Sequence, residues 1–444
     1  MGIDAGPRIW STVRKSLPAQ VGESWVLVAA MLASHLLSYL YQLFMSRSLS
    51  APDFGLLNGL MAFSLLLTIP VNTIQLTMAR QTAETLVHAD FGRVRAYLRA
   101  DLRRATPWIL GGIAAYLALS PVLASFFHTS LFPIWLVGGI SLIALYSPFA
   151  EGVLQGMQRF QALAVTIFTR YVGKLALGVL LVVVGLDVEG ALGGLLLSKA
   201  AAALLAFMVM AAGWEGARSE LHSSAEGANT TPRNLWPTLV AYAAVLTLTN
   251  ADVALARHYL PATDSAHYAI AALLGKIAYY LPSFVIVIVV PKVASARASG
   301  RPTMRYLVAA TLATLAASGS VVMVYALFPQ QIISLLFGAG YASAATSSLV
   351  FYYSVAMVVL SVLYLEVHYL LARRHTRPLY GLIAGPAIAV LGMMAWHGDG
   401  FELVTALMLG LLVGLLALNL LALVLKSYDG DLRSTLRGDM MGKP

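Results

Sequence analysis

Seven charged residues stand inside long apolar stretches of this sequence, where a charge needs a partner or a function. Four are basic and three are acidic, namely Arg170, Lys174, Lys199 and Lys276, and Glu151, Asp252 and Glu366. A charge at bilayer depth is costly, and such residues usually face the interior of a helix bundle, where they bind an ion or a substrate. We therefore treat all seven as candidate functional residues.

The basic residues point to an anionic substrate. At about 1.5 Å per residue, Lys174, Lys199 and Lys276 lie about 14–18 Å into their stretches, near the middle of a bilayer. Arg170 precedes Lys174 by one helical turn and shares its helix face. Lys and Arg can replace the water around an anion such as a lipid diphosphate. The alternative is that these cations form structural ion pairs with the intramembrane acids.

Each intramembrane acid allows two interpretations. Asp252 could bind a proton or a sodium ion that drives transport, because a carboxylate in a low-dielectric site can be neutralised cyclically. It could equally pair with Arg257 near a helix end. Glu151 and Glu366 occupy matching places in the two halves of the chain. They could gate the cytoplasmic side by pairing with the basic turns that follow them, or they could be solvated helix ends.

Few other residues suggest chemistry. Tyr280, one turn after Lys276, is the aromatic residue best placed to stack on a sugar. The chain has no cysteine, and no second histidine stands at ligand spacing from His35, so no metal site is predicted. No phosphate-binding glycine loop is present, which excludes ATP as the direct energy source. We predict no cofactor, with coupling to a proton or sodium gradient left open.

Long apolar helices must position these residues. Hydrophobic residues make up 59% of the chain and charged residues 11%, and the mean hydropathy is +0.78. A helix that spans a bilayer needs about 20 apolar residues. Twelve stretches meet this requirement, at 24–45, 56–78, 105–127, 132–154, 161–186, 190–213, 235–258, 265–290, 304–328, 346–371, 378–397 and 402–426. The sequence therefore predicts an all-α integral membrane protein with about twelve transmembrane helices.

The distribution of charge orients these helices. Of the 29 Lys and Arg residues, 23 fall in alternate loops and four lie within the apolar stretches, whereas the other loops hold Arg47, Arg257 and acids such as Asp187 and Asp264. This is the positive-inside bias, and it predicts that both termini are cytoplasmic. The net charge of +9 is thus explained by orientation and by contact with anionic lipids, and no nucleic-acid partner is predicted.

The two halves of the chain resemble each other. The link R-S-L-S-A-P-D-F-G-L from Arg47 and the link R-H-Y-L-P-A-T-D-S-A-H-Y from Arg257 are each followed by an apolar run with a proline, Pro70 and Pro282. A repeat of six helices returns the chain to the same side, so the halves are predicted to be parallel bundles related by a pseudo-twofold along the membrane normal. We predict bundles at 1–213 and 235–444, a cytoplasmic linker at 214–234, and a cleft between the bundles that Lys276 faces.

Several motifs carry a family resemblance. They are the link from Arg47, its repeat from Arg257, Leu154-Gln155-Gly156, Asn250-Ala251-Asp252 and Gly275-Lys276. Together they resemble the oligosaccharide (O-antigen or polysaccharide repeat-unit) flippases of the multidrug/oligosaccharidyl-lipid/polysaccharide exporter superfamily. The resemblance implies a multi-pass protein of the bacterial inner membrane. Such a protein flips undecaprenyl-diphosphate-linked repeat units from the cytoplasmic to the periplasmic leaflet for surface polysaccharide biosynthesis.

Other functions fit less well. A cation-coupled multidrug exporter of the same superfamily would call for midplane acids, and a lipid II flippase usually adds helices beyond twelve. A membrane polymerase or ligase generally needs a sizeable periplasmic loop, which is missing. The turn A-E-T-L-V-H-A-D-F-G is not the one expected of a major-facilitator transporter. We therefore predict a transporter, not an enzyme, acting as a monomer alongside a polysaccharide polymerase and glycosyltransferases. Its predicted substrate-binding residues are Lys174, Lys276, Arg170, Lys199 and Tyr280.

Overall fold

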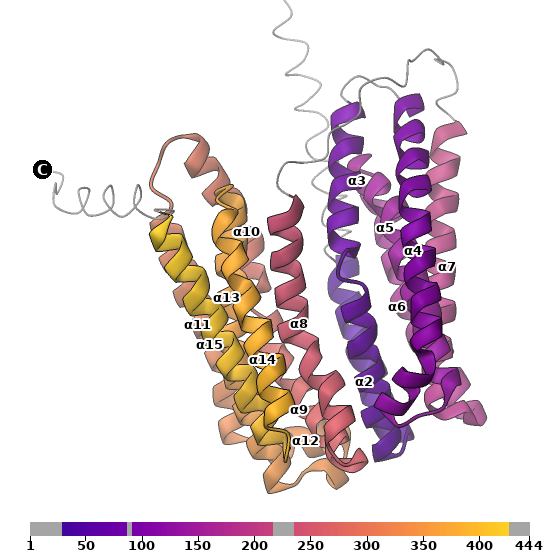
Figure 1. Ribbon diagram of the computed structural model, residues 1–444, viewed down its shortest axis with the longest axis vertical. Helices are drawn as coiled ribbons and strands as arrows, with labels where there is room; N and C mark the ends of the chain where they lie inside the picture. The colour runs from indigo at the N-terminus through magenta and orange to yellow at the C-terminus, as the bar shows by residue number, and fades with distance from the viewer. Residues whose placement is uncertain (1–28, 87–90, 216–234, 426–444) are drawn as a thin grey trace, which may run out of the picture. The chain divides into compact units, whose positions relative to one another are not determined.

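The computed structural model describes residues 29–86, 91–215 and 235–425, and nearly all of this part of the chain is helical (Figure 1). The described residues contain no β-strand. Each of the twelve predicted stretches corresponds to a helix or to a consecutive pair of helices, although the first is described only from residue 29. The predicted all-α membrane fold is confirmed.

Nine of the described helices are long and apolar enough to cross a membrane, or ten if α2 (Ala51–Leu67) and α3 (Val71–Leu86), bent by 43°, form one span. One of the nine is the 53-residue stretch Phe160–Ala212, which is more than twice the length of about 20 residues that one crossing needs. It is broken at Gly185, which has a φ of 96°. Gly173 lies against Ser198 and Gly178 against Gly194, so its two arms are antiparallel and can cross twice.

The chain divides into two compact units. The first comprises the described residues of 1–48, 71–121 and 131–230. Its elements are the helix at 29–48, α3, most of α4 (Phe91–Phe127), α5 (Leu131–Gly156), α6 (Phe160–Leu181), the short π-helix η1 (Val182–Leu186) and α7 (Asp187–Glu215). The tightest packing in this unit is between α6 and α7, where small residues face each other.

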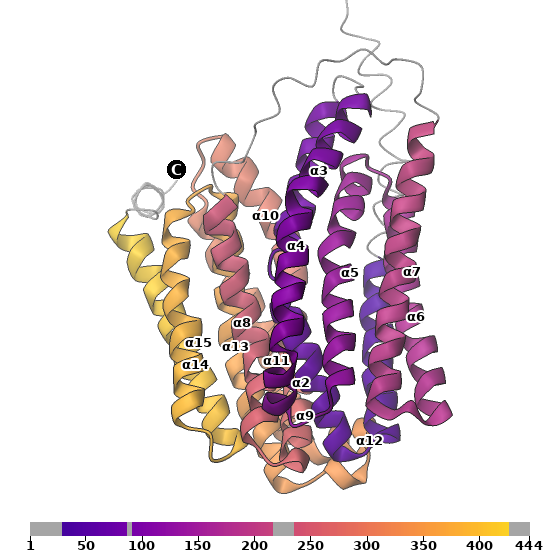
Figure 2. The same ribbon diagram turned by 45° about the vertical axis from the view of Figure 1, so that its right-hand side comes forward.

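The second unit comprises the described residues of 49–70, 122–130 and 231–444. It contains α2, the end of α4, α8 (Leu235–Tyr259), α9 (Ala262–Tyr280), α10 (Ser283–Ala298), α11 (Met304–Leu327), α12 (Pro329–Phe337), η2 (Ala339–Tyr341), α13 (Ala344–Ala372), η3 (Arg377–Ile383), α14 (Ala384–Ala395) and α15 (Gly400–Val424). In Figure 2, α14 and α15 run side by side, as their close packing requires. Most of the predicted linker, at 216–234, lies outside the described residues, and the bundle boundaries at 213 and 235 stay a prediction.

The helix α2 packs within the second unit although it lies early in the sequence. Its contact surface is the sequence Gly55-Leu-Leu-Asn-Gly59, in which two glycines stand one turn apart. A Cβ atom at Gly59 would lie 2.7 Å from the Cβ of Arg257 on α8, and one at Gly55 would overlap Ser265 on α9. Small residues at this spacing allow helix backbones to approach closely in a membrane.

Breaks in two helices fall at matching places of the predicted repeat. The chain leaves helical geometry at Pro70, between α2 and α3, and turns again at Pro282, between α9 and α10. Proline lacks an N–H group and clashes with the preceding turn, so it ends or bends a helix. These positions agree with the internal repeat read from the sequence.

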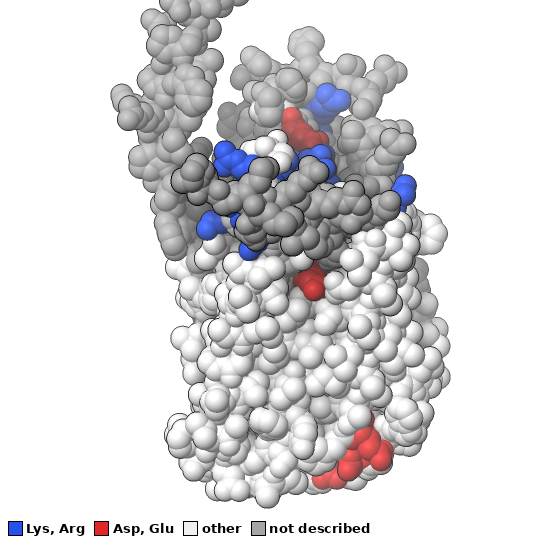
Figure 3. Space-filling view, turned by 90° about the vertical axis from the view of Figure 1, so that its left-hand side faces the viewer, with Lys and Arg blue, Asp and Glu red and all other residues white. Residues whose placement is uncertain are grey.

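Charges on the surface separate along the helices. In Figure 3 the visible Lys and Arg side chains lie toward the upper end of the face. Acidic side chains form a group at the lower end, where no Lys or Arg is visible, and others lie higher on the face. In the second unit, α10 ends and α11 begins at one end with Lys292, Arg297 and Arg301, whereas Asp399 and Glu402 lie where α15 begins. This is the separation that the positive-inside pattern predicts, and the assignment of the basic end to the cytoplasm stays a prediction.

Candidate functional site

Four of the predicted residues come together inside the first unit. Glu151 lies on α5, Arg170 and Lys174 lie one turn apart on α6, and Lys199 lies on α7. The guanidinium of Arg170 forms an ion pair with the buried carboxylate of Glu151. Lys199 lies within electrostatic range of Arg170, Glu151 and Lys174. We call this group of four residues the cationic cluster.

Lys174 is held by the helix at 29–48. Its ammonium donates a hydrogen bond to the Oγ of Ser38 at 3.1 Å and lies 4.3 Å from the centre of the Tyr41 ring. The Tyr41 hydroxyl donates to the carbonyl of Ala191 on α7 at 3.1 Å, which fixes the ring beneath the cation. A cation over an aromatic face is attracted by the ring quadrupole. The ring fits here because Gly178 has no side chain, since a Cβ atom there would lie 2.6 Å from it.

The cationic cluster contains three basic side chains and one acidic side chain. Among the described residues, neither Lys174 nor Lys199 has a carboxylate at ion-pair distance. Lys174 is only 5% exposed, and a buried cation without a carboxylate is costly to maintain. The cluster is therefore electrostatically suited to bind an anion.

Asp252 and Lys276 belong to a separate hydrogen-bonded network in the second unit. Asp252 is fully buried on α8, and its Oδ2 accepts hydrogen bonds from the hydroxyls of Tyr268 on α9, at 3.1 Å, and Tyr353 on α13, at 2.7 Å. The ammonium of Lys276 donates to the Oδ1 of Asn250 at 3.4 Å and lies within electrostatic range of Asp252. We call these five residues the carboxylate network.

The carboxylate network balances its own charges, with one cation and one acid. Asp252 does not pair with Arg257, which was one interpretation of this residue, because its partners are two tyrosines and a nearby lysine. The Oδ1 atom of Asp252 has no hydrogen-bond partner in the described part of the chain. Gly275 makes room for Tyr353, whose ring would overlap a side chain at that position.

The remaining predicted residues lie apart from these two groups. Tyr280 is 51% exposed, and its ring lies 4.9 Å from that of Tyr279. Glu366 on α13 accepts a hydrogen bond from the Nδ2 of Asn419 on α15 at 2.8 Å. Within the described residues, Glu151 and Glu366 thus pair with a residue of another helix and not with the basic turns that follow them. Their role as a gate stays a prediction.

Sequence reasoning missed the residues that hold the candidate cations. Ser38 and Tyr41 lie in an apolar stretch and carry no charge, so nothing at their own positions marks them as partners of Lys174. Tyr353 looks like a packing residue in the sequence. The sequence does contain one signal of these aromatic partners, namely a glycine beside each lysine that leaves room for a ring. Gly178 follows Lys174 by one turn, and Gly275 directly precedes Lys276.

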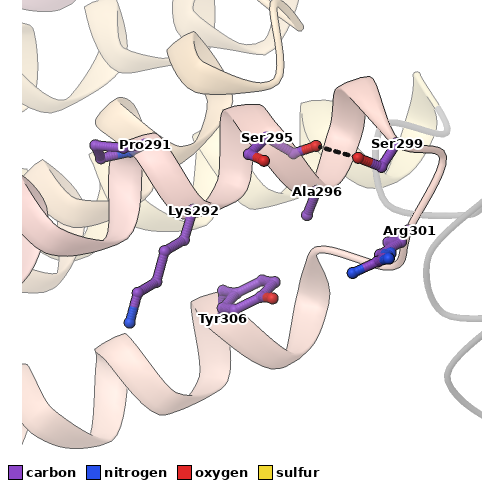
Figure 4. Close-up of a pocket in the computed structure, with 7 residues that line it drawn as sticks. All are labelled: Pro291, Lys292, Ser295, Ala296, Ser299, Arg301 and Tyr306. Atoms are coloured by element: carbon purple, nitrogen blue, oxygen red, sulfur yellow. Dashed lines mark hydrogen bonds between the residues drawn. The ribbon is translucent and has the colours of Figure 1, made fainter. Parts of the chain in front are cut away.

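A pocket of about 300 Å³ opens at the basic end of the second unit, between α10 and α11 (Figure 4). Its lining includes Lys292, Arg301 and Tyr306, and the Oγ of Ser299 donates to the carbonyl of Ser295 at 3.0 Å. Lys292 and Arg301 are both exposed. Water can therefore satisfy their charges, and the pocket has no buried cation that requires a ligand.

Comparison with known proteins gives one family match. The model of the family described as "Polysaccharide biosynthesis protein" matches residues 22–295, which is more than half of the chain. No curated protein matches the sequence.

Solved structures share the fold at low sequence identity. A lipid II flippase, MurJ, in its inward closed conformation has a TM-score of 0.69 at 12% identity, covering 94% of this chain and 91% of that one. An inward-facing multidrug resistance MATE family transporter of the MOP superfamily has a TM-score of 0.63 at 12% identity, covering 89% and 96%. The eukaryotic MATE transporter AtDTX14 has a TM-score of 0.57 at 15% identity, covering 94% and 99%. At these identities the likeness shows the fold.

Proposed function

Because this chain belongs to the polysaccharide biosynthesis protein family and has the fold of flippase and multidrug transporters, we propose that it flips lipid-linked oligosaccharides. Its substrate is an undecaprenyl-diphosphate-linked repeat unit for surface polysaccharide. It moves this substrate from the cytoplasmic to the periplasmic leaflet of a bacterial inner membrane by alternating access. The protein works as a monomer with both termini in the cytoplasm, beside the polymerase and glycosyltransferases of the same pathway.

The observation that carries this proposal is the excess of positive charge in the cationic cluster. A lipid diphosphate is an anion that cannot enter hydrocarbon uncompensated. Lys174 and Lys199 have no carboxylate partner among the described residues, so their ammonium groups can donate to phosphate oxygens. Charge-assisted hydrogen bonds of this kind are among the stronger ones in proteins. The apolar polyprenyl tail stays in the lipid while the headgroup passes.

Each residue of the cluster has a distinct part in this proposal. Lys174 is positioned in advance by Ser38 and the Tyr41 ring. Lys199 contributes a second charge from α7. Arg170 is held by Glu151, so the diphosphate must compete with that carboxylate for the guanidinium. This competition allows the substrate to be released as well as bound.

The carboxylate network supplies a route for ion coupling. A proton on Asp252 removes the negative charge beside Lys276 and leaves that cation free to attract the diphosphate. Loss of the proton restores the balance and favours release. Lys276 thereby contacts the substrate only in the protonated state, with Tyr280 offering an exposed aromatic ring for the sugar.

A cation-coupled drug exporter is the second candidate, because transporters named for multidrug resistance share the fold. The sign of the charge separates the two proposals. A cationic drug would be repelled by the cationic cluster, whereas a lipid diphosphate would be attracted. A lipid II flippase would also bind a diphosphate, so the saccharide must be varied in the test.

The test is transport in proteoliposomes with a fluorescent undecaprenyl-diphosphate oligosaccharide. We expect the Lys174→Gln/Lys199→Gln variant to lose about a hundredfold or more in rate, since each lost charged hydrogen bond is worth about 1.5–3 kcal/mol. The matched control is Lys292→Gln, which removes an exposed lysine and should leave the rate unchanged. An undiminished rate in the double variant, or transport of a cationic dye in place of the lipid, would overturn the proposal. Faster transport of lipid II than of the oligosaccharide would reassign the substrate.

A further inference from the structure

A second pocket lies where α8 ends, at the opposite end of the second unit from the pocket between α10 and α11. Its volume is about 370 Å³, and its lining includes Arg257, His258, Tyr259 and His128. Neither the cationic cluster nor the carboxylate network includes any of these residues. We call it the Arg257 pocket.

Arg257 is a buried cation without a bonded partner. Its side chain is only 7% exposed, and its Nε atom is buried with no hydrogen-bond acceptor. Within 29–86, 91–215 and 235–425 the guanidinium makes no hydrogen bond and no ion pair. A guanidinium has five donors, and a buried donor left unsatisfied costs about 1–3 kcal/mol. The pocket therefore borders a group that requires an acceptor.

Asp53 on α2 is the acid that acts on Arg257, but it does so from beyond ion-pair distance. The carboxylate of Asp53 instead accepts a hydrogen bond from Ser50 at 2.5 Å, at the start of α2. Gly59 of α2 lies against the Arg257 stem and fixes its position. Asp53 thus offsets part of the charge of Arg257 and leaves its donors available to a ligand.

Aromatic rings line the pocket and are held in place. The His258 ring stacks on Phe126, with centroids 3.9 Å apart and planes 8° apart, and its Nδ1 lies 2.8 Å from the Phe126 carbonyl. The Tyr259 ring stacks on His397 at 4.2 Å and 9°. No set of three metal-binding side chains occurs in the described part of the chain, so these histidines do not suggest a metal site. Rigid aromatic faces attract the C–H edges of a ring through their quadrupole.

We propose that the Arg257 pocket binds an acidic sugar, with its carboxylate on Arg257 and its ring against His258 and Tyr259. Arg recognises planar carboxylates through paired hydrogen bonds. The volume falls at the small end of the range of about 300–1,000 Å³ found for ligand pockets, which suits one sugar residue. The assignment of this acidic sugar to the repeat unit rests on the proposed flippase function. The recognition of an acidic sugar by the pocket does not depend on that function.

The test is binding of glucuronate, glucose and inorganic phosphate to the purified full chain in nanodiscs, followed by saturation-transfer NMR. We expect glucuronate to bind at least tenfold more tightly than glucose, and Arg257→Gln to abolish that difference. Arg301→Gln, the same change at an exposed arginine of the same unit, is the matched control and should retain it. Equal binding of glucuronate and glucose to the unmodified protein would overturn the proposal. If phosphate binds as tightly as glucuronate, the pocket recognises anions in general, and the assignment of an acidic sugar would be wrong.

Two further variants keep the proposal testable on its own. Asp53→Asn removes the acid that offsets Arg257, so glucuronate should bind several-fold more tightly; unchanged affinity would contradict the assignment even if Arg257→Gln does not fold. Lys174→Gln/Lys199→Gln should leave glucuronate binding intact. Failure of the flippase test with retained glucuronate binding would therefore refute the proposed transport and leave the pocket standing.

Discussion

The cationic cluster and the carboxylate network differ in how the charge of a lysine inside an apolar unit is compensated. Both contain a lysine inside an apolar unit, on α6 in one case and on α9 in the other. Lys276 has Asp252 nearby, and Asp252 has two tyrosine donors. Lys174 has a hydroxyl and an aromatic face but no acid. A balanced network stabilises the protein by itself, whereas an unbalanced cluster gains its full stabilisation only when an anion binds.

The largest effect that separates the two groups should be on stability. Asp252→Ala leaves the half-buried Lys276 without its nearby acid and deprives Tyr268 and Tyr353 of their acceptor. Each buried hydroxyl left without an acceptor costs about 1–3 kcal/mol, so Asp252→Ala should lose about 2–6 kcal/mol, to be measured by thermal unfolding in detergent. Lys174→Met breaks no ion pair and should cost far less. The comparison fails if the two variants lose equal stability.

A smaller effect should appear in transport. Lys199→Gln removes a cation that makes no ion pair with any described residue, so the melting temperature should hardly change. The flipping rate of the lipid-linked oligosaccharide should fall about tenfold, the equivalent of about 1.4 kcal/mol. Arg301→Gln serves as the control for removal of a solvated cation. A fall in stability without a fall in rate would show that Lys199 is structural.

The smallest effect concerns the ring beneath Lys174. Tyr41→Leu removes the cation–π contact and the hydrogen bond to Ala191, a contact worth about 0.5–2 kcal/mol. We expect a loss at the low end of that range, about threefold in rate, because Lys174 keeps its hydrogen bond to Ser38. Tyr41→Phe should restore most of it because the ring remains. Equal losses in both variants would assign the effect to the hydroxyl instead.

The helices and their breaks could be predicted from the sequence, because they follow from local properties. Apolar length sets the spans, and Pro70 and Pro282 end helices by their own chemistry. The partners of the charges could not be predicted in the same way. Glu151 meets Arg170 from another helix, and Tyr353 reaches Asp252 across 101 residues of sequence. Such contacts depend on how helices pack, and hydropathy carries no information about that.

For the site residues, too, local properties could be predicted and packing contacts could not. The depth of Lys174, Lys199 and Lys276 identified them as candidates, but only packing separates the lysine that has an acid from the two that do not. The sequence allowed two interpretations of Asp252, an ion-coupling site or a partner of Arg257, because Asp252 and Arg257 lie near the end of one helix. The side chains instead belong to different groups, and the two tyrosines that Asp252 contacts gave no sequence signal of this role.

The packing of α2 has a consequence for how the protein is made. Through Gly55 and Gly59, α2 packs against Arg257 of α8 and Ser265 of α9, residues that are synthesised about 200 residues later. At about 5–20 residues per second, α2 is exposed to lipid or to a chaperone for about 10–40 s before its partners arrive. The first half of the chain therefore cannot complete its packing alone during biosynthesis. A truncated product that ends before α8 would therefore present an unmatched glycine face on α2.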